Sequence, residues 1–296
     1  MTYNHINVET VTPTIGAHIS GVDLNNITDQ AVYDEIRKAL WEHHVVFFRD
    51  QEIDPEPYIE LGKQFGELEE HEFFPTLDSH NTIQVIAHEN AEKTGTDQWH
   101  TDVTFRTRPN SVSVLRCVEM PECRGGDTLW MSTAAAFDAL DEPLKDMIRE
   151  FEADHDMPWF FRSTNYYELK GGNMKDQSHN DLLEQEINLI RANPYSTHPM
   201  VINHPVTGRE TLFVNSIWTK RIRDLSPELS STLLNYLYGW VHKPDFAVRF
   251  KWEENSVAIW DNFATQHYAT HDYGGERRVM QRMTAGSAVP KSERLV

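Results

Sequence analysis

The sequence has few cysteines and few positive charges. Only two of its 296 residues are cysteine, Cys117 and Cys123, so no disulfide framework is expected. Lysine and arginine number 27 against 46 aspartates and glutamates, which gives a formal net charge of −19. An acidic chain repels phosphate backbones and anionic lipids, so we expect neither nucleic-acid nor membrane partners.

Long apolar runs are also lacking. No uncharged segment approaches the roughly 18 apolar residues that are needed to cross a bilayer. The opening segment, MTYNHINVET, has neither the basic nor the apolar region of a signal peptide. We therefore expect a cytoplasmic protein without a membrane span.

Short β-type runs make up much of what is present. Helices are predicted after Asp29, after Asp54, after Ser132, after Pro143 and after Ser226. In the last of these, Leu229, Leu233, Leu237 and Trp240 are expected to face inward. Strands are predicted from Val45 and over 82–86, 111–116, 127–131, 200–203, 211–214, 247–252 and 257–260.

Many short strands with a few helices outside them favour a closed or sandwiched β core, such as a jelly roll. The fold class is therefore mainly β with flanking helices. No linker or repeat divides the chain, so a single domain over 1–296 is expected. The polar, poorly periodic stretch at 156–195 is predicted to be a lid or surface excursion.

The strongest local signal is WHTDVTF, which contains His100 and Asp102. On an extended strand, residues i and i+2 share a face, so both side chains could bind one borderline divalent ion. His267, 165 positions after Asp102, is the candidate third ligand. Such a triad leaves positions open for other ligands. In a chain with 15 histidines, however, a His-x-Asp pair alone is more often a pair of solvated or capping residues.

Two arginines strengthen the hypothesis of a site. Arg278 and Arg282 alternate with Met280 along a predicted strand, so both guanidinium groups are expected on one face. Arginine is suited to bidentate recognition of carboxylates. The pair beside an open metal site would suit an anionic cosubstrate. Taken alone, it could equally be a solvated charge pair on an edge strand.

Taken together, WHTDVTF, GGDTLW, HPVTGRETLFVN, WDNFATQHYA and RRVMQR closely resemble the taurine dioxygenase (TauD/TfdA) family, and the resemblance covers nearly the whole chain. The family implies a double-stranded β-helix (the cupin-like jelly roll) and a reaction that uses Fe(II), O2 and 2-oxoglutarate. By this resemblance, His100, Asp102 and His267 are the iron ligands. Thr128 and Arg278 hold the distal carboxylate of 2-oxoglutarate, and Arg282 reaches its C1 carboxylate and the substrate.

The resemblance also implies substrate-contacting positions. His71 and Val103 match residues of the taurine pocket, whereas Phe74, Thr96 and Trp218 stand where taurine dioxygenase has a tyrosine, an asparagine and a phenylalanine. Losing hydrogen-bond partners for an amine disfavours taurine. We expect a small anionic organic substrate that is not taurine: a sulfonate, a sulfate ester or a carboxylate. Plain core packing also explains Phe74 and Trp218, and a methylated ammonium group is a further possibility.

Several alternatives stay open at this stage. Halogenases of this iron group replace the ligand carboxylate by a small residue, so Asp102 favours hydroxylation, with possible cleavage of the product. The same cofactors could give desaturation, epoxidation or rearrangement. A non-catalytic jelly-roll binding protein would be expected to have lost a ligand or an arginine, and a structural zinc site would need a closed shell rich in cysteine and histidine. The family is often dimeric or tetrameric, so a homo-oligomer is expected.

Overall fold

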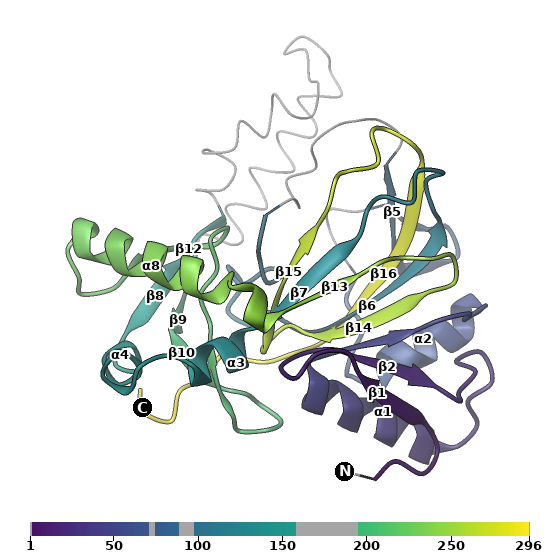
Figure 1. Ribbon diagram of the computed structural model, residues 1–296, viewed down its shortest axis with the longest axis horizontal. Helices are drawn as coiled ribbons and strands as arrows, with labels where there is room; N and C mark the ends of the chain where they lie inside the picture. Colours follow the sequence, from purple (N-terminus) through teal and green to yellow (C-terminus); the bar gives the residue numbers. More distant parts are fainter. Residues whose placement is uncertain (1, 71–74, 89–97, 158–194, 296) are drawn as a thin grey trace.

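The computed structural model describes residues 2–70, 75–88, 98–157 and 195–295. Its largest sheet has eight strands and lies on the right of Figure 1. In spatial order the strands are β1 (Asn7–Thr10), β2 (Ala17–Ser20), β3 (Val45–Phe48), β14 (Val257–Asp261), β6 (Asn110–Glu119), β16 (Arg278–Ser287), β5 (His80–His88) and β4 (Thr76–Leu77). Neighbouring strands are antiparallel except β2 and β3, which are parallel.

A second sheet packs against the inner face of the first. Its strands are β13 (Ala247–Phe250), β7 (Thr128–Ser132) and β15 (Thr265–Ala269). Large apolar side chains meet between the sheets: Phe47 stacks on Phe250 with ring centroids 4.3 Å apart, and Trp130 packs edge-on against Trp260. Two sheets that enclose one apolar interior form the double-stranded β-helix predicted from the sequence, so the fold class is confirmed.

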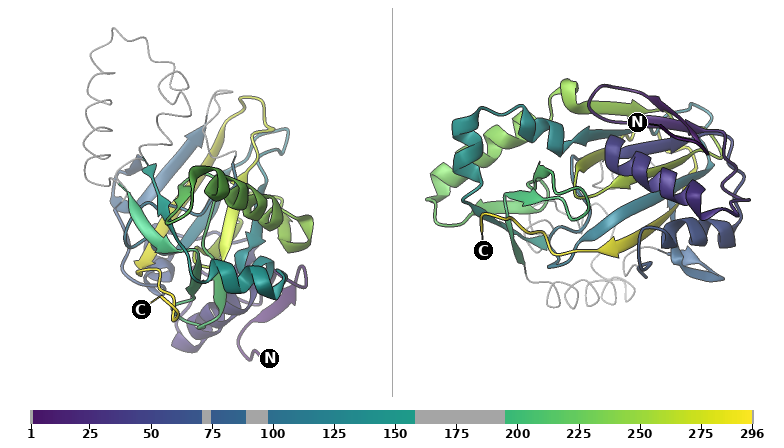
Figure 2. Two further views of the ribbon diagram at one scale, coloured as in Figure 1. Left: turned by 90° about the vertical axis from the view of Figure 1, so that its left-hand side faces the viewer. Right: turned by 90° about the horizontal axis from the view of Figure 1, so that it is seen from below.

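Two helices cover the outer face of the large sheet. α1 (Gln30–His43) begins where the Asp29 side chain accepts a hydrogen bond from the backbone of Ala31, and α2 (Pro55–Lys63) begins at a proline. Both helices bury an apolar face against the strands, and both are seen beside the sheet in the right-hand view of Figure 2. This packing buries β16 on both faces, which matters because β16 carries the two candidate arginines.

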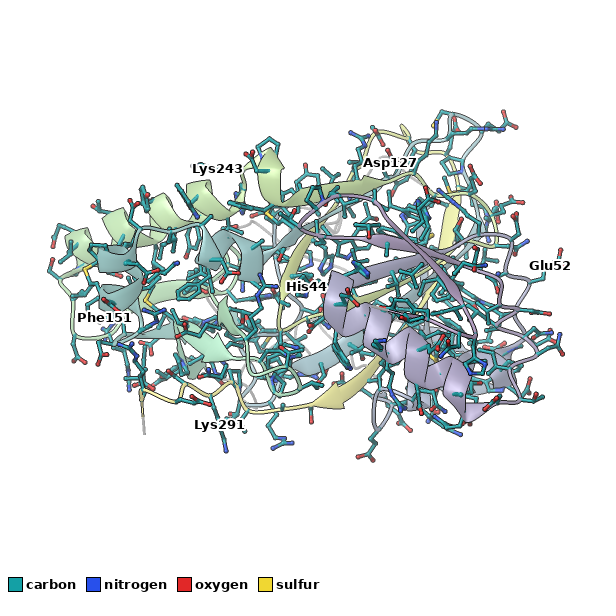
Figure 3. The ribbon with its side chains drawn as sticks, turned by 60° about the horizontal axis from the view of Figure 1, so that its bottom comes forward. His44, Glu52, Asp127, Phe151, Lys243 and Lys291 are labelled. Carbon is teal, nitrogen blue, oxygen red and sulfur yellow. The ribbon has the colours of Figure 1, made fainter. Side chains whose placement is uncertain are left out.

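The other half of the molecule has a core of its own. It contains α3 (Thr133–Asp138), α4 (Glu142–Ile148), α8 (Pro227–Val241) and the 3-10 helix η1 (Pro244–Phe246), with strands β8 (Glu152–His155), β9 (Ser196–Pro199), β10 (Val201–Asn203), β11 (Glu210–Leu212) and β12 (Thr219–Ile222). Figure 3 shows Phe151 in this half and Glu52 at the opposite end, with His44 between them. The hairpin predicted at Gly208 joins β10 to β11.

Each β run predicted from the sequence falls on an observed strand, and each predicted helix is present. The strands that were not predicted are β1, β2, β4, β8, β9, β12 and β15. The inward face of α8 was predicted in part: Leu237 is buried, and Leu233 and Trp240 are partly buried against the core, whereas Leu229 is 53% exposed. Most of the predicted lid at 156–195 lies outside the described residues. None of the helices described is long and apolar enough to cross a membrane.

Candidate metal centre

The three predicted ligands come together in the interior, between the two sheets. His100 and His267 form an isolated antiparallel bridge with reciprocal backbone hydrogen bonds of 3.0 and 2.7 Å. Asp102 Oδ1 lies 3.7 Å from His100 Nε2 and 3.9 Å from His267 Nε2. One atom from each residue lies within 4.8 Å of the others, and all three residues are buried. A single ion could therefore contact all three side chains.

The two histidines are in the protonation state that a metal ligand needs. His100 Nδ1 lies 2.7 Å from the carbonyl oxygen of Gln98, which can only accept, so Nδ1 carries the proton and Nε2 keeps its lone pair. Burial lowers the pKa of His100. Burial, followed by the neighbouring His100, lowers the pKa of His267 to about 3. Both imidazoles are neutral at neutral pH, as metal ligation requires.

These donors fit a particular class of metal. Two imidazole nitrogens and one carboxylate oxygen on one side of an ion form the facial triad of non-haem Fe(II) oxygenases, which leaves positions for further ligands. A structural zinc site would need a fourth ligand of similar kind. Neither cysteine belongs to the group of potential ligands found among the described residues. The donor set therefore fits Fe(II) better than structural zinc.

The backbone at Asp102 differs from the sequence expectation. The His-x-Asp segment is not a strand, because the chain leaves the bridge at His100 and turns at Asp102. Val103, which follows, is buried and has a φ of +46°. That conformation is unfavourable for a β-branched side chain, and such strain is typical of functional sites. The carboxylate thus meets the imidazoles through a tight turn and not through strand alternation.

Arg278 lies at the start of β16 and is only 5% exposed. One of its terminal nitrogens, Nη2, donates a 2.9 Å hydrogen bond to the carbonyl of Gly126. Gly126 has a φ of +87°, and a Cβ there would lie 2.7 Å from Arg278 Nε. Arg278 makes no ion pair with the described residues, and its Nε has no hydrogen-bond partner among them. A buried guanidinium of this kind is able to bind an anion.

Thr128 and Arg282 extend the polar lining of the same interior. Thr128, the first residue of β7, accepts a 2.9 Å hydrogen bond from the indole nitrogen of Trp252.

Arg282 donates from Nε to Gln84 at 2.9 Å and from Nη1 to Asp102 Oδ2 at 3.3 Å. The structure therefore brings Arg282 into direct contact with the candidate metal ligand.

Trp218 is the candidate substrate residue whose contacts are best described. Its indole N–H donates to the backbone carbonyl of Thr101, between His100 and Asp102, at 3.0 Å. Its ring packs against Phe105 with centroids 4.8 Å apart. Val103 is in the same turn. The remaining candidates, His71, Phe74 and Thr96, lie outside the described residues.

Sequence reasoning missed several polar residues around Asp102. Ser113, Asn262 and Gln84 are buried beside the carboxylate or its neighbours. The segment WDN, residues 260–262, was noticed as part of a motif, but no role followed from it. Nothing in the local pattern around Ser113 or Gln84 signals a functional residue, because both stand in ordinary strand sequences.

Residues 7–284 match the family described as taurine catabolism dioxygenase TauD, TfdA family. The chain belongs to this family. It is 36% identical over 287 residues to an alpha-ketoglutarate-dependent sulfate ester dioxygenase of Pseudomonas putida, a match that covers 96% of this chain and 91% of that protein. It is also 36% identical over 284 residues to an alkylsulfatase of Acinetobacter baylyi, covering 94% and 84%.

The structural comparison agrees with this assignment. The crystal structure of a taurine dioxygenase from Burkholderia xenovorans superposes on this chain with a TM-score of 0.80 at 32% identity. The superposition covers 98% of this chain and 92% of that one. Membership of the TauD/TfdA family, predicted from the motifs, is confirmed, and with it the dioxygenase class.

Proposed function

We propose that this protein uses Fe(II), O2 and 2-oxoglutarate to hydroxylate a small organic anion, preferably a sulfate ester or a sulfonate other than taurine. The enzyme class is that of the 2-oxoglutarate-dependent dioxygenases, to which the similar sulfate ester and sulfonate enzymes belong. The observation that carries the proposal is the buried convergence of His100 Nε2, His267 Nε2 and Asp102 Oδ1 beside the buried Arg282, with the buried Arg278 on the same strand.

In this proposal each polar group has one task. His100, Asp102 and His267 hold the metal, which couples oxidation of the substrate to the conversion of 2-oxoglutarate and O2 into succinate and CO2. Arg278 and Thr128 bind the distal carboxylate of 2-oxoglutarate. One oxygen atom of O2 enters succinate, and the other enters the substrate as a hydroxyl group.

Arg282 and Trp218 shape the substrate end of the pocket. Arg282 is held by Gln84 and Asp102, so its guanidinium needs little reorganisation to meet an anionic group. The only polar hydrogen of the Trp218 ring donates to Thr101, so the ring presents an apolar surface. These features suit an anion with an apolar body. Hydroxylation of the carbon next to the ester oxygen or the sulfur would give an unstable product that releases sulfate or sulfite.

Desaturation, epoxidation or rearrangement of the same substrate is the alternative within the proposed chemistry. A carboxylate substrate is the third candidate anion. A purely binding protein is less favoured, because the ligands and both arginines are all present.

The proposal includes three broader points. We expect one dioxygenase domain over 1–296 with a lid at 156–195, a homodimer or homotetramer, and action in the cytoplasm on freely diffusing substrates. Light scattering on the purified protein measures the oligomeric state.

The test is succinate formation with Fe(II), ascorbate and 2-oxoglutarate across a panel of alkyl sulfates, sulfonates including taurine, and carboxylates. We expect O2-dependent succinate that rises with alkyl sulfates or sulfonates and is lost in His267→Ala. The matched control is His18→Ala, which removes a half-buried histidine packed on Phe47 and Phe250 away from the metal centre. Taurine as the best substrate would overturn the substrate proposal, and no turnover above His267→Ala would overturn the dioxygenase proposal.

A further inference from the structure

The two oxygens of the Asp102 carboxylate have different surroundings. Oδ1 faces the imidazole nitrogens of His100 and His267, at 3.7 and 3.9 Å. Oδ2 lies 3.4 Å from the hydroxyl of Ser113 and 3.3 Å from Nη1 of Arg282. Each of the Oδ2 contacts is long and therefore weak by itself. They reach the same oxygen from two neighbouring strands, β6 and β16, so together they restrict the rotation of the carboxylate.

Ser113 is in turn the middle of a buried hydrogen-bond chain. The indole Nε1 of Trp260 lies 2.9 Å from Asn262 Oδ1, and Asn262 Nδ2 lies 2.9 Å from Ser113 Oγ. Trp260, Asn262 and Ser113 are each at most 2% exposed, so water cannot replace these bonds. Strand pairing places them, since Ser113 of β6 stands opposite Trp260 of β14.

The direction of every bond in this chain follows from its first member. An indole N–H can only donate, so the atom of Asn262 that faces Trp260 must be the amide oxygen. The amide NH2 group then points at Ser113 and donates to its oxygen. Because that oxygen accepts from Asn262, the Ser113 hydroxyl is oriented to donate to Asp102 Oδ2. Trp260 therefore sets which way the proton of Ser113 points.

We propose that Ser113 and Asn262 are positioning residues that hold the Asp102 carboxylate with Oδ1 turned toward the metal. The inference rests on the proposed metal centre and adds residues that do not touch the metal. Partners that orient ligand side chains typically change metal affinity by about 10- to 100-fold when removed. The inference also gives a task to the WDN segment, whose Asn262 connects β14 to a ligand on the turn after His100.

Two variants break the chain in different ways. Ser113→Ala removes the hydroxyl. Asn262→Asp keeps the shape of the side chain but replaces the NH2 donor by an oxygen, so the Ser113 hydroxyl would donate to residue 262 and no longer to Asp102. Ser256→Ala is the matched control, because Ser256 is equally buried but its hydroxyl accepts from Arg49, away from the ligands.

The experiment measures Co(II) binding to the metal-free full-length protein by titration calorimetry, the visible absorption of bound Co(II), and thermal unfolding of each metal-free variant. We expect Ser113→Ala and Asn262→Asp to weaken Co(II) binding by about 10-fold or more and to alter the Co(II) spectrum. Ser256→Ala should bind within about twofold of the wild type, since it removes no contact of a ligand. A purely structural role would lower the unfolding temperature without this difference in affinity.

The outcomes distinguish failure of the positioning role of Ser113 and Asn262 from failure of the metal centre itself. Wild-type affinity and spectrum in both variants would overturn the positioning role, as would an equal loss of affinity in Ser256→Ala. If the wild type failed to bind Co(II), or His267→Ala bound it equally well, the metal centre itself would be refuted and the positioning role with it. If Ser113→Ala fails to fold, the Co(II) affinity and spectrum of Asn262→Asp, which keeps the shape of the side chain, test the positioning role.

Discussion

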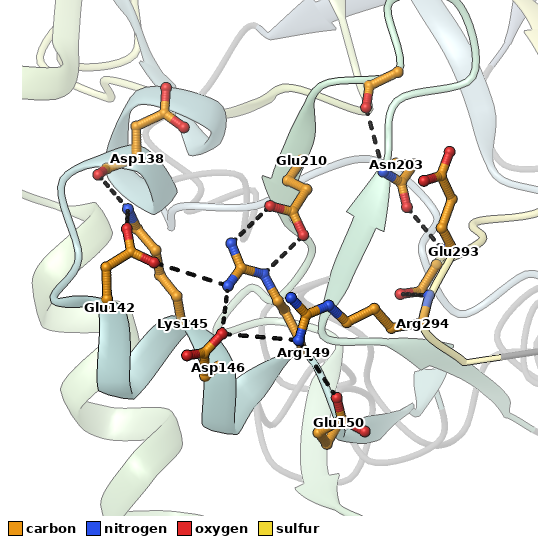
Figure 4. Close-up of polar contacts among 12 residues, drawn as sticks. Asp138, Glu142, Lys145, Asp146, Arg149, Glu150, Asn203, Glu210, Glu293 and Arg294 are labelled. Carbon is orange, nitrogen blue, oxygen red and sulfur yellow. Dashed lines mark hydrogen bonds and ion pairs between the residues drawn. The ribbon is translucent and has the colours of Figure 1, made fainter.

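Two polar networks of this protein differ in how exposed their side chains are and in whether their hydrogen bonds have one fixed direction. Figure 4 shows the first, in which α4 and the C-terminal segment exchange ion pairs. Arg149 bonds both oxygens of Glu210 at 2.8 Å, and Arg294 lies 3.7 Å from Asp146 and 3.8 Å from Glu150. The second network links Trp260, through Asn262 and Ser113, to Asp102, and its members are at most 8% exposed.

The difference lies in what happens when one member is removed. In the first network the side chains of Asp146, Glu150 and Arg294 are more than half exposed, so water can solvate them when a partner is lost. Such exposed ion pairs typically contribute about 0–1 kcal/mol each. In the second, a lost partner leaves a buried polar group unbonded, which costs about 1–3 kcal/mol. The exposed network is also redundant, since several acids share Arg149, whereas the buried chain has one possible direction. We therefore expect chemistry that needs a precisely held ligand at the buried network.

The largest expected effect comes from removing the carboxylate at the end of the buried chain. Asp102→Ala deletes a candidate metal ligand and leaves Arg282 with one contact fewer. We expect Co(II) affinity to fall by more than about 100-fold, beyond the range of indirect positioning effects, and succinate formation to fall to background. Calorimetry and the succinate assay measure both. Asp146→Ala, which removes a carboxylate of the exposed network, is the control and should retain activity; full activity of Asp102→Ala would contradict the comparison.

A smaller effect, on KM for 2-oxoglutarate, is expected when Gly126, which packs against the buried Arg278, is replaced. In Gly126→Ala the new Cβ would meet Nε and Cδ of Arg278 at 2.7 and 2.8 Å. A displaced guanidinium loses a charge-assisted hydrogen bond of about 1.5–3 kcal/mol, so KM for 2-oxoglutarate should rise by about 10- to 100-fold. Steady-state kinetics of succinate formation at varied 2-oxoglutarate concentration measures this KM.

Gly208→Ala is the control for that substitution. Gly208 also has a positive φ, +71°, but nothing lies within 4 Å of the added Cβ. It should destabilise the protein slightly and leave KM unchanged. An unchanged KM in Gly126→Ala would show that Arg278 does not bind the cosubstrate.

Acid should destabilise the protein through buried histidines. Burial lowers the pKa of His44 to about 4, from 6.5 for an exposed histidine. Below pH 6.5 His44 becomes protonated in the unfolded chain but stays neutral in the folded protein. Its contribution to the free energy of unfolding is therefore fully present above this pH. It falls by up to about 1.4 kcal/mol per pH unit for this residue as pH drops toward 4. His44→Asn does not titrate and suits the φ of +64°. Urea unfolding at pH 7.5 and 5.5 should show that the free energy of unfolding falls less in the variant than in the wild type. An equal fall in both proteins would contradict the lowered pKa of His44.

The smallest effect is expected in the exposed network. Arg294→Ala removes contacts to Asp146 and Glu150, whose side chains are 62% and 60% exposed. We expect a loss of less than about 1 kcal/mol in the free energy of unfolding and no change in metal affinity. Urea unfolding and calorimetry test this, and a loss above about 2 kcal/mol would remove the distinction between the two networks.

Much of the fold was predictable because its signals are local. Alternating β-type runs located β5, β6, β7, β13 and β14, and helix caps such as Asp29 located α1. The buried face of α8 was predicted only in part, because Leu229 is exposed in the first turn and Leu234, next to the expected Leu233, is buried. Helical periodicity gives the approximate direction of the apolar face, and the neighbouring core decides which residues at its edges are covered.

The sequence by itself determined which residue types this protein has for a site, namely the candidate ligands and the two arginines, and it determined the family. Their roles at the site stay predictions. Only the tertiary structure decided that Asp102 lies in a turn, that Arg282 contacts it, and that Trp260 orients Ser113 through Asn262. The physical reason is that spacing along the chain describes one segment at a time. The direction of a buried hydrogen-bond chain depends instead on donors and acceptors that different strands bring together.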